Sequence, residues 1–134
     1  QWWFDTKDTW LSAMGLSVLR VTHGQLTART DTDSPALFGG DTMLDTRVYD
    51  TVVIGLAASA GTQGRLWWRT SLRKFTLENS VPFALTPDGA VHEYRLNLGA
   101  HRGWRGYLEG LRLDPTDVAG ASIALDYVRV LPKE

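Results

Sequence analysis

Short runs of β-branched and aromatic residues, separated by clusters of Gly, Asp, Asn and Pro, occupy most of this sequence. Such runs predict β-strands, because these side chains suit a pleated, half-buried surface. No stretch shows a clear helical stripe, although residues 8–14 are compatible with one helical turn. About eight strands are expected, at Leu16–Val21, Gln25–Arg29, Val48–Ala58, Arg65–Thr70, Val81–Leu85, His92–Leu98, Tyr107–Leu113 and Ser122–Leu131.

Strands that follow one another without helices between them favour an all-β fold. We therefore expect a two-sheet antiparallel β-sandwich or jelly roll, and not a parallel α/β sheet. A chain of 134 residues is long enough for one hydrophobic core, so residues 1–134 are expected to form a single domain. The breaks between the runs contain turn-forming residues, and Thr86–Gly89 is interpreted as a hairpin loop.

Composition excludes several classes of function. Fourteen Lys and Arg against 15 Asp and Glu give a net charge of -1, which disfavours nucleic acid as a partner. The absence of Cys excludes disulfides and thiolate chemistry. No apolar run has the length of a membrane helix, and no signal peptide is visible. Because the chain begins at Gln1, we expect an excised domain or a mature fragment.

Alternation of side chains around the Trp pair divides its two indoles between opposite faces of a strand. Leu66 and Trp68 share one face, whereas Arg65, Trp67 and Arg69 share the other. Trp68 is therefore predicted in the core. Trp67 between two guanidinium groups forms an amphipathic patch that suits a flat, partly polar ligand. The alternative is a solvated face on which an arginine stacks.

The alternation of apolar and polar side chains is also informative in two other expected strands. In His92–Leu98 the even positions form the apolar set, so Arg95 is expected to point outward. His92 is then interpreted as a hydrogen-bonded residue at the edge of the core, and not as a catalyst. In Tyr107–Leu113 the apolar set changes parity, and a β-bulge at Gly110 would explain that change.

Residues suited to catalysis are scarce. The four glutamates are Glu78, Glu93, Glu109 and Glu134, and the three histidines lack metal-binding spacing. No nucleophile motif such as GxSxG and no phosphate-binding loop is present, so an enzyme and a nucleotide cofactor are both disfavoured.

Acidic residues gather near the start of the chain. Asp126 lies in the last expected strand, which in sandwiches commonly runs beside the first. Oxygen ligands from loops are what Ca²⁺ requires, so a structural calcium is one interpretation, although turn-forming aspartates would look the same. The N-terminal residues concerned are Asp5, Asp8, Asp31, Asp33 and Asp41.

Over nearly its whole length the sequence resembles the jelly-roll modules with a galactose-binding-like fold that are attached to secreted bacterial carbohydrate-active enzymes and surface proteins. The segments that carry the resemblance are Trp3-Phe4-Asp5, Trp10, Asp33-Ser34-Pro35, Arg65–Thr70, Asp88-Gly89, His92-Glu93-Tyr94, Trp104-Arg105-Gly106, Leu111–Pro115 and Leu125–Val130.

This resemblance implies non-catalytic polysaccharide binding that targets a parent enzyme or surface protein, in a secreted or cell-surface bacterial setting. It implies that Trp67 and Arg69 lie on a concave sheet face, and that Asp5 and Asp126 are candidate ligands of a structural Ca²⁺. Trp104 would belong either to a rim site or to a structural plug.

Our leading hypothesis is that a sugar stacks on Trp67. Hydrogen bonds to the sugar would come from outward-facing arginines, and carboxylates of an acidic glycan would pair well with guanidinium groups. These arginines are Arg65, Arg69, Arg95 and Arg112. The alternatives are an accessory sandwich that has no glycan of its own, and a small lyase or hydrolase.

Overall fold

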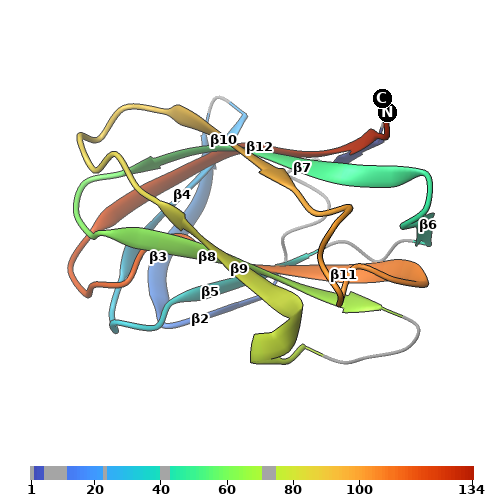
Figure 1. Cartoon of the computed structure of the whole chain (residues 1–134). Coiled ribbons are helices and arrows are strands. Elements are labelled where there is room, and N and C mark those ends of the chain that lie inside the picture. Colours follow the sequence, from blue (N-terminus) through green and yellow to red (C-terminus); the bar gives the residue numbers. More distant parts are fainter. Residues whose placement is uncertain (1, 5–11, 23, 40–42, 71–74) are drawn as a thin grey trace.

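Two β-sheets face each other across the molecule (Figure 1). The computed structural model describes residues 2–4, 12–22, 24–39, 43–70 and 75–134. None of these residues belongs to a helix long and apolar enough to cross a membrane. In chain order the described elements are β1 (Trp2–Phe4), β2 (Ser12–Met14), β3 (Leu16–Thr22), β4 (Gln25–Thr30), β5 (Ala36–Gly39), β6 (Leu44–Asp45), β7 (Tyr49–Ala58), β8 (Gln63–Thr70), the 3-10 helix η1 (Leu77–Asn79), β9 (Ser80–Ala84), β10 (His92–Asn97), β11 (Tyr107–Asp114) and β12 (Ser122–Pro132).

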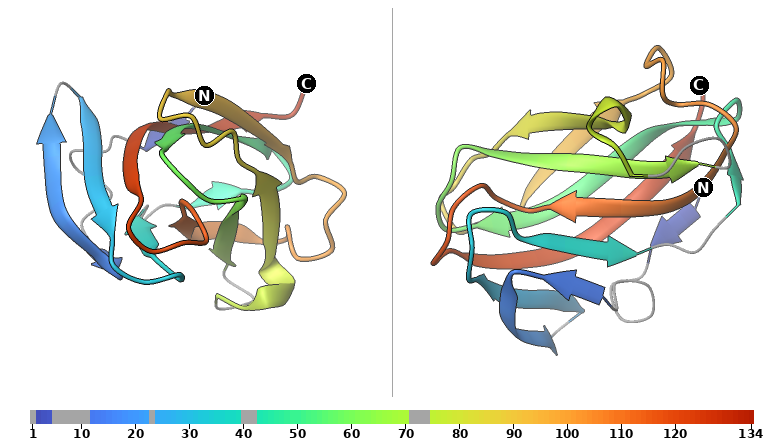
Figure 2. Two further views of the ribbon diagram at one scale, coloured as in Figure 1. Left: turned by 90° about the vertical axis from the view of Figure 1, so that its left-hand side faces the viewer. Right: turned by 90° about the horizontal axis from the view of Figure 1, so that it is seen from below.

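The order of the strands confirms the predicted two-sheet antiparallel sandwich. Sheet A has the order β10-β7-β12-β4-β3, and β1 also pairs with β12. Sheet B has the order β2-β5-β11-β8-β9, and β6 also pairs with β11. The chain passes from one sheet to the other between β7 and β8 and again between β9 and β10. In the right-hand view of Figure 2 sheet B lies in front, with β8 in green, β11 in orange and β5 in teal.

All eight strands expected from the sequence are present, and no end differs by more than two residues. The sequence did not reveal β1, β2, β5 and β6, which are too short to show alternation. Ser12–Met14 forms β2, so the helical turn expected over residues 8–14 is wrong for these three residues. Residues 8–11 lie outside the described part of the chain.

The core lies between the inward faces of the sheets, and Trp68 is fully buried in it, as predicted. Its indole Nε1 donates to the carbonyl oxygen of Gly103 at 2.9 Å. Its ring meets that of Trp104 edge-on, with centroids 5.4 Å apart. Trp104 is 4% exposed and donates from Nε1 to the carbonyl of Tyr49 at 2.8 Å. Of the two roles considered for Trp104, the structure shows the structural plug, because a buried indole is unavailable to a ligand at the rim.

Parity within β10 and β11 also follows the prediction. The register of β11 on β8 shifts between Leu108 and Gly110, so the predicted bulge is confirmed. Because of that extra residue, Leu108 and Leu111 both face the core. His92 at the start of β10 is half-buried and lies 2.9 Å from the carboxylate of Asp88, which confirms a hydrogen-bonded position at the edge of the core.

The interpretation of Thr86–Gly89 as a hairpin loop is wrong. The segment does turn, with Gly89 at a φ of 81°, but it joins β9 of sheet B to β10 of sheet A. Turn residues set the local backbone conformation, whereas the pairing of the flanking strands depends on contacts with distant segments. Gly-containing loops therefore mark turns without distinguishing a hairpin from a crossing between sheets.

Candidate functional site

The face of sheet B that points away from the core gathers aromatic and cationic side chains. In β8 the outward positions are Arg65, Trp67 and Arg69, because alternate residues point inward. In β11 the bulge brings Arg112 opposite Trp67 and Asp114 opposite Arg65. Phe38 of β5 lies opposite Arg112 on the other side. We call this surface the Trp67 face, and define it as Phe38, Arg65, Trp67, Arg69, Arg112 and Asp114.

The indole of Trp67 is held by its neighbours in one orientation. Its Nε1 donates to Oδ2 of Asp114 at 3.0 Å. The Arg112 guanidinium carbon lies 4.4 Å from the centroid of the Trp67 ring and 5.7 Å from that of Phe38. Arg112 in turn donates from Nε to Oδ1 of Asp114 at 2.9 Å. A hydrogen bond and a cation–π contact thus fix the Trp67 indole, with the Arg112 guanidinium over its ring, before any ligand arrives.

Two further guanidinium groups flank Trp67 along β8. Arg65 donates from Nη1 to the hydroxyl of Ser80 at 2.7 Å, and its guanidinium carbon lies 6.0 Å from the Trp67 ring. Arg69 is half-buried, and its guanidinium lies beside Gly110. A Cβ added to Gly110 would be 3.4 Å from Arg69 Nη2. Among the described residues, none makes a hydrogen bond or an ion pair with the side chain of Arg69. Its donors are therefore available to a ligand.

The Trp67 face is positive although the chain as a whole carries a net charge of -1. Asp114 neutralises Arg112 through the ion pair at 2.9 Å. The charges of Arg65 and Arg69 are not balanced by a carboxylate of this face. A planar guanidinium presents several N–H donors in a fixed arrangement, so the face is equipped to bind hydroxyl or carboxylate oxygens beside an aromatic ring.

The structure brings together four of the six predicted ligand-binding residues: Trp67, Arg65, Arg69 and Arg112. Arg95 lies in β10 and points outward from sheet A, where its Nη2 is 3.7 Å from Glu134 Oε1. It therefore belongs to the opposite side of the sandwich. Trp104 is buried in the core and does not reach the Trp67 face.

Sequence reasoning missed two members of the Trp67 face. Asp114 shares the parity of Arg112 two residues earlier, and this spacing was a usable signal. Phe38 lies in β5, a strand of four residues that gave no detectable pattern.

The predicted calcium ligands are only partly covered by the structure. Asp5 lies outside the described residues, as do Asp8 and Asp41. Asp126 lies at the bulge of β12 between Leu125 and Tyr127. The described residues contain no group of three His, Asp or Glu side chains that suits a metal ion. Ca²⁺ takes about six to eight oxygen ligands, so Asp126 would need partners from other residues, such as Asp5.

One expectation about that region is confirmed. The last strand does run beside the first, since β1 pairs with β12 and Phe4 lies opposite Val128. β1 therefore ends two residues away from Asp126 along the partner strand.

Comparison with known proteins gives a structural but not a sequence match. No protein-family model and no curated protein sequence matches this chain. A low-affinity xylan-binding module, CBM86 of Roseburia intestinalis, is similar in structure, with a TM-score of 0.70 and 13% identity over 98% of this chain and 95% of that one.

Two further modules are similar over most of the chain. A variant of the family 29 module CBM29-2 complexed with cellulohexaose has a TM-score of 0.63 and 11% identity, over 92% of this chain and 79% of that one. A CBM4 module has a TM-score of 0.63 and 14% identity, over 90% of this chain and 93% of that one. At such identities the likeness concerns the fold, and the chain has the jelly-roll β-sandwich fold of carbohydrate-binding modules.

Proposed function

We propose that this chain is a non-catalytic polysaccharide-binding module that uses the Trp67 face. The observation that carries the proposal is the fixed indole of Trp67 beside Arg65 and Arg69, on the outward face of a jelly-roll sheet. The similar structures support it, because they include a xylan-binding module and a module complexed with cellulohexaose. In this role the domain would keep a parent enzyme or surface protein on its glycan.

The chemistry of the Trp67 face matches that of a sugar chain. The C–H face of a pyranose ring packs on an aromatic ring, and the ring hydroxyls meet hydrogen-bond donors around it. Arg112 covers part of the indole, so the platform combines an indole with a stacked guanidinium. Arg65 and Arg69 would then donate to oxygens of neighbouring sugar units.

We propose further that the bound glycan is acidic. Arg65 and Arg69 lie two residues apart from Trp67 on either side, and neither is paired with a carboxylate among the described residues. A sugar carboxylate can accept two parallel N–H bonds from one guanidinium, which makes such contacts stronger than those to a neutral hydroxyl.

The first experiment compares Trp67 variants by calorimetry and affinity electrophoresis on neutral and anionic polysaccharides. Trp67→Ala should weaken binding by on the order of 1 kcal/mol, or about fivefold in Kd. Trp67→Phe keeps an aromatic ring but loses the hydrogen bond to Asp114. Its affinity should therefore fall between that of the wild type and that of Trp67→Ala. Arg95→Ala is the matched control, because Arg95 lies on the opposite sheet. Wild-type affinity in a folded Trp67→Ala variant would refute the proposed platform.

The same binding measurements test separately whether the Trp67 face prefers an acidic polysaccharide. Arg69→Gln should weaken binding of the anionic polysaccharide more than binding of the neutral one, and added salt should reduce the difference because mobile ions screen exposed charges. Equal losses on both polysaccharides would contradict the acidic preference while leaving glycan binding intact.

The second candidate function is an accessory sandwich that packs on another domain. Exposed apolar side chains near β6 favour it, namely Met43, Val48 and Tyr107, which are 66%, 49% and 43% exposed. If no member of a broad glycan array binds, while substitution of these three residues by Ser prevents association with the parent protein, the accessory role is the correct one.

We also propose that the domain is part of a secreted or cell-surface bacterial protein and that it holds a structural Ca²⁺ with Asp5 and Asp126. The pairing of β1 with β12 supports the metal proposal, because it places the C-terminal end of β1 close to Asp126. The gene that encodes the domain should specify an export signal and a catalytic or surface domain in the same chain.

A further inference from the structure

A groove of about 450 Å³ crosses the face of sheet A that points away from the core. Its lining comes from strands β3, β4, β7 and β12 and from the loop that contains Gly89. In Figure 1, β7 and β12 lie in the upper sheet, whereas β8 and β11 lie in the lower sheet. The groove is therefore on the opposite side of the molecule from the Trp67 face, with which it shares no residue. We call it the sheet A groove.

Small side chains form the floor of the sheet A groove. Ala57 of β7 pairs with Ala124 of β12, and Ala124 pairs with Thr27 of β4, so these outward positions form one row across the sheet. Arg20 of β3 pairs with Thr27 and extends the row to a fourth strand. Because neighbouring strands lie about 4.8 Å apart, the row is about 14 Å long. A floor of this length suits a segment of a polymer better than a compact molecule.

The rows on either side of this floor carry larger side chains. On one side, Ser122 of β12 pairs with Arg29 of β4. On the other side, Tyr127 pairs with Gly55 of β7, and its ring covers that glycine so closely that no Cβ would fit there. The Tyr127 hydroxyl reaches across β7 and donates to Glu93 of β10. The floor is therefore bordered by a hydroxyl and a guanidinium on one side and by a fixed aromatic ring on the other.

The charge of the sheet A groove is positive and unbalanced. Arg20 and Arg29 are both exposed and both line the groove, whose lining contains no Asp or Glu. Among the described residues, none makes a hydrogen bond or an ion pair with either guanidinium. Asp31, two residues after Arg29, instead accepts a hydrogen bond from the Ser17 hydroxyl at 2.9 Å. The groove therefore attracts an anionic ligand.

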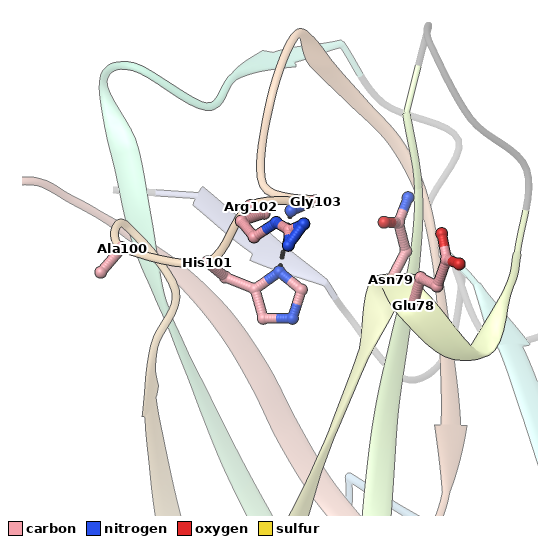
Figure 3. A pocket seen from close by; sticks show the side chains of 6 residues that line it. All are labelled: Glu78, Asn79, Ala100, His101, Arg102 and Gly103. Atoms are coloured by element: carbon pink, nitrogen blue, oxygen red, sulfur yellow. Dashed lines mark hydrogen bonds between the residues drawn. The ribbon is translucent and has the colours of Figure 1, made fainter.

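A larger hollow of about 600 Å³ lies at the end of the sandwich, between η1 and the connection from β10 to β11 (Figure 3). Its lining contains both Glu78 and Arg102, so the charges of these two side chains balance each other. The excess of positive charge thus distinguishes the sheet A groove from this hollow.

The polar groups of the sheet A groove favour a polysaccharide over a peptide. Besides the two guanidinium groups, the lining presents the hydroxyls of Thr27, Ser59 and Ser122. The Ser59 N–H donates to the Ser122 carbonyl at 3.0 Å, and the Ser122 N–H donates to the Ser59 hydroxyl at 2.8 Å. A sheet face presents side chains and not a free strand edge, so a bound peptide would lack regular acceptors for its backbone N–H groups. Sugar hydroxyls both donate and accept, and sugar carboxylates pair well with guanidinium groups.

We propose that the sheet A groove binds an acidic polysaccharide, with sugar carboxylates on Arg20 and Arg29 and sugar hydroxyls on Thr27 and Ser122. The choice of a polysaccharide rests on the proposed function, whereas the groove and its charge do not. Because the Trp67 face and the sheet A groove point in opposite directions, one module holds two polysaccharide chains and bridges them.

The first test is an NMR titration with tetragalacturonate, with cellotetraose as the neutral counterpart. The backbone N–H signals of Ser122 and Ala124 report on the sheet A groove, and the Trp67 indole N–H reports on the Trp67 face. Tetragalacturonate should shift the groove signals in the wild type and equally in Trp67→Ala, whereas cellotetraose should leave them unchanged. Sodium sulfate and a tetraglutamate peptide test whether a simple anion or an acidic peptide binds there as well.

Substitutions in the groove separate its charge from its shape. The double variant Arg20→Gln with Arg29→Gln should raise the Kd of the groove for tetragalacturonate about fivefold, and its melting temperature should not change because both side chains are exposed. Ala124→Leu fills the floor without changing a charge and should also weaken binding. Arg47→Gln is the matched control, because Arg47 is an exposed arginine that lies outside the groove and pairs with Asp45.

Bridging is measured by light scattering from long polygalacturonate. The wild type should increase the scattering, because each module joins two chains. Trp67→Ala and the double variant Arg20→Gln with Arg29→Gln should each increase it less, since each variant weakens one of the two sites. Arg47→Gln should scatter as the wild type does.

Three results would overturn the proposal. Tetragalacturonate leaves the Ser122 and Ala124 signals unchanged, or sulfate or tetraglutamate binds the groove as tightly as tetragalacturonate does, or the folded double variant binds there with wild-type affinity. The Trp67 indole signal decides the proposed function separately. A shift of that signal without groove shifts would refute the groove and support the Trp67 face, and groove shifts without it would do the reverse.

Discussion

Single carboxylates hold side chains and loops of this molecule in defined positions. Asp114 orients Trp67 and Arg112 on the exposed sheet face. Asp117 joins the β11–β12 loop to the β7–β8 loop. Its carboxylate accepts hydrogen bonds from the Thr62 hydroxyl at 2.6 Å and from the Thr62 backbone N–H at 2.9 Å. These hydrogen bonds, first that of the Thr62 hydroxyl and then that of the N–H, lower the pKa of Asp117 because they stabilise its charged form.

The lowered pKa of Asp117 predicts a contribution to stability that depends on pH. The unfolded chain binds the proton at a higher pH than the folded chain does, so the contribution is complete above the unfolded pKa and disappears as pH falls through the folded pKa. Asp117→Asn should lower the urea midpoint at neutral pH and reduce its further decline on acidification. Glu134→Gln, at an exposed C-terminal residue, is the control. If the urea midpoint of Asp117→Asn declined on acidification by as much as that of the wild type, the predicted contribution of Asp117 would be contradicted.

At the scale of elements, turns between the sheets differ in how much they depend on glycine. Gly61, between β7 and β8, has a φ of 114°, and an added Cβ would lie 1.8 Å from the Thr116 hydroxyl. That hydroxyl donates to the Ala60 carbonyl at 2.7 Å, so it is not free to move. Gly89, between β9 and β10, has a φ of 81° and no heavy atom within 4 Å of the same position.

These two turns predict different costs for the same substitution. Gly89→Ala should destabilise the fold by about 1–2 kcal/mol, the cost of a left-handed conformation with a Cβ. Gly61→Ala should cost more, because the steric clash with Thr116 is added to that strain. Chemical denaturation of both variants measures the difference. Equal costs would show that the loop around Gly61 relaxes freely.

For the whole molecule, the pairing of the first strand with the last suggests where a metal would stabilise the fold. If Ca²⁺ binds near Asp126, it binds only the folded state and raises stability by mass action. Excess chelator should then lower the melting temperature, and calcium should restore it. Asp126→Asn should abolish the response, whereas the control Asp88→Asn should keep it. A melting temperature that does not change with chelator would count against the site.

The alternation of side chains let the sequence by itself determine the eight longest strands and the division of the Trp pair. Strand parity is local, because successive side chains point to opposite faces whatever the rest of the chain does. Trp68 in the core, Trp67 outside and the bulge at Gly110 all follow from such short patterns.

Only the tertiary structure decided which outward residues share one surface. Arg95 and Arg112 have the same outward parity, yet sheet pairing places them on opposite sides of the molecule. The same applies to Trp104, which closes the core, and to Asn79, which packs against Gly103. These contacts join segments that are distant in the sequence, and strand pairing and packing, which no local pattern encodes, bring them together.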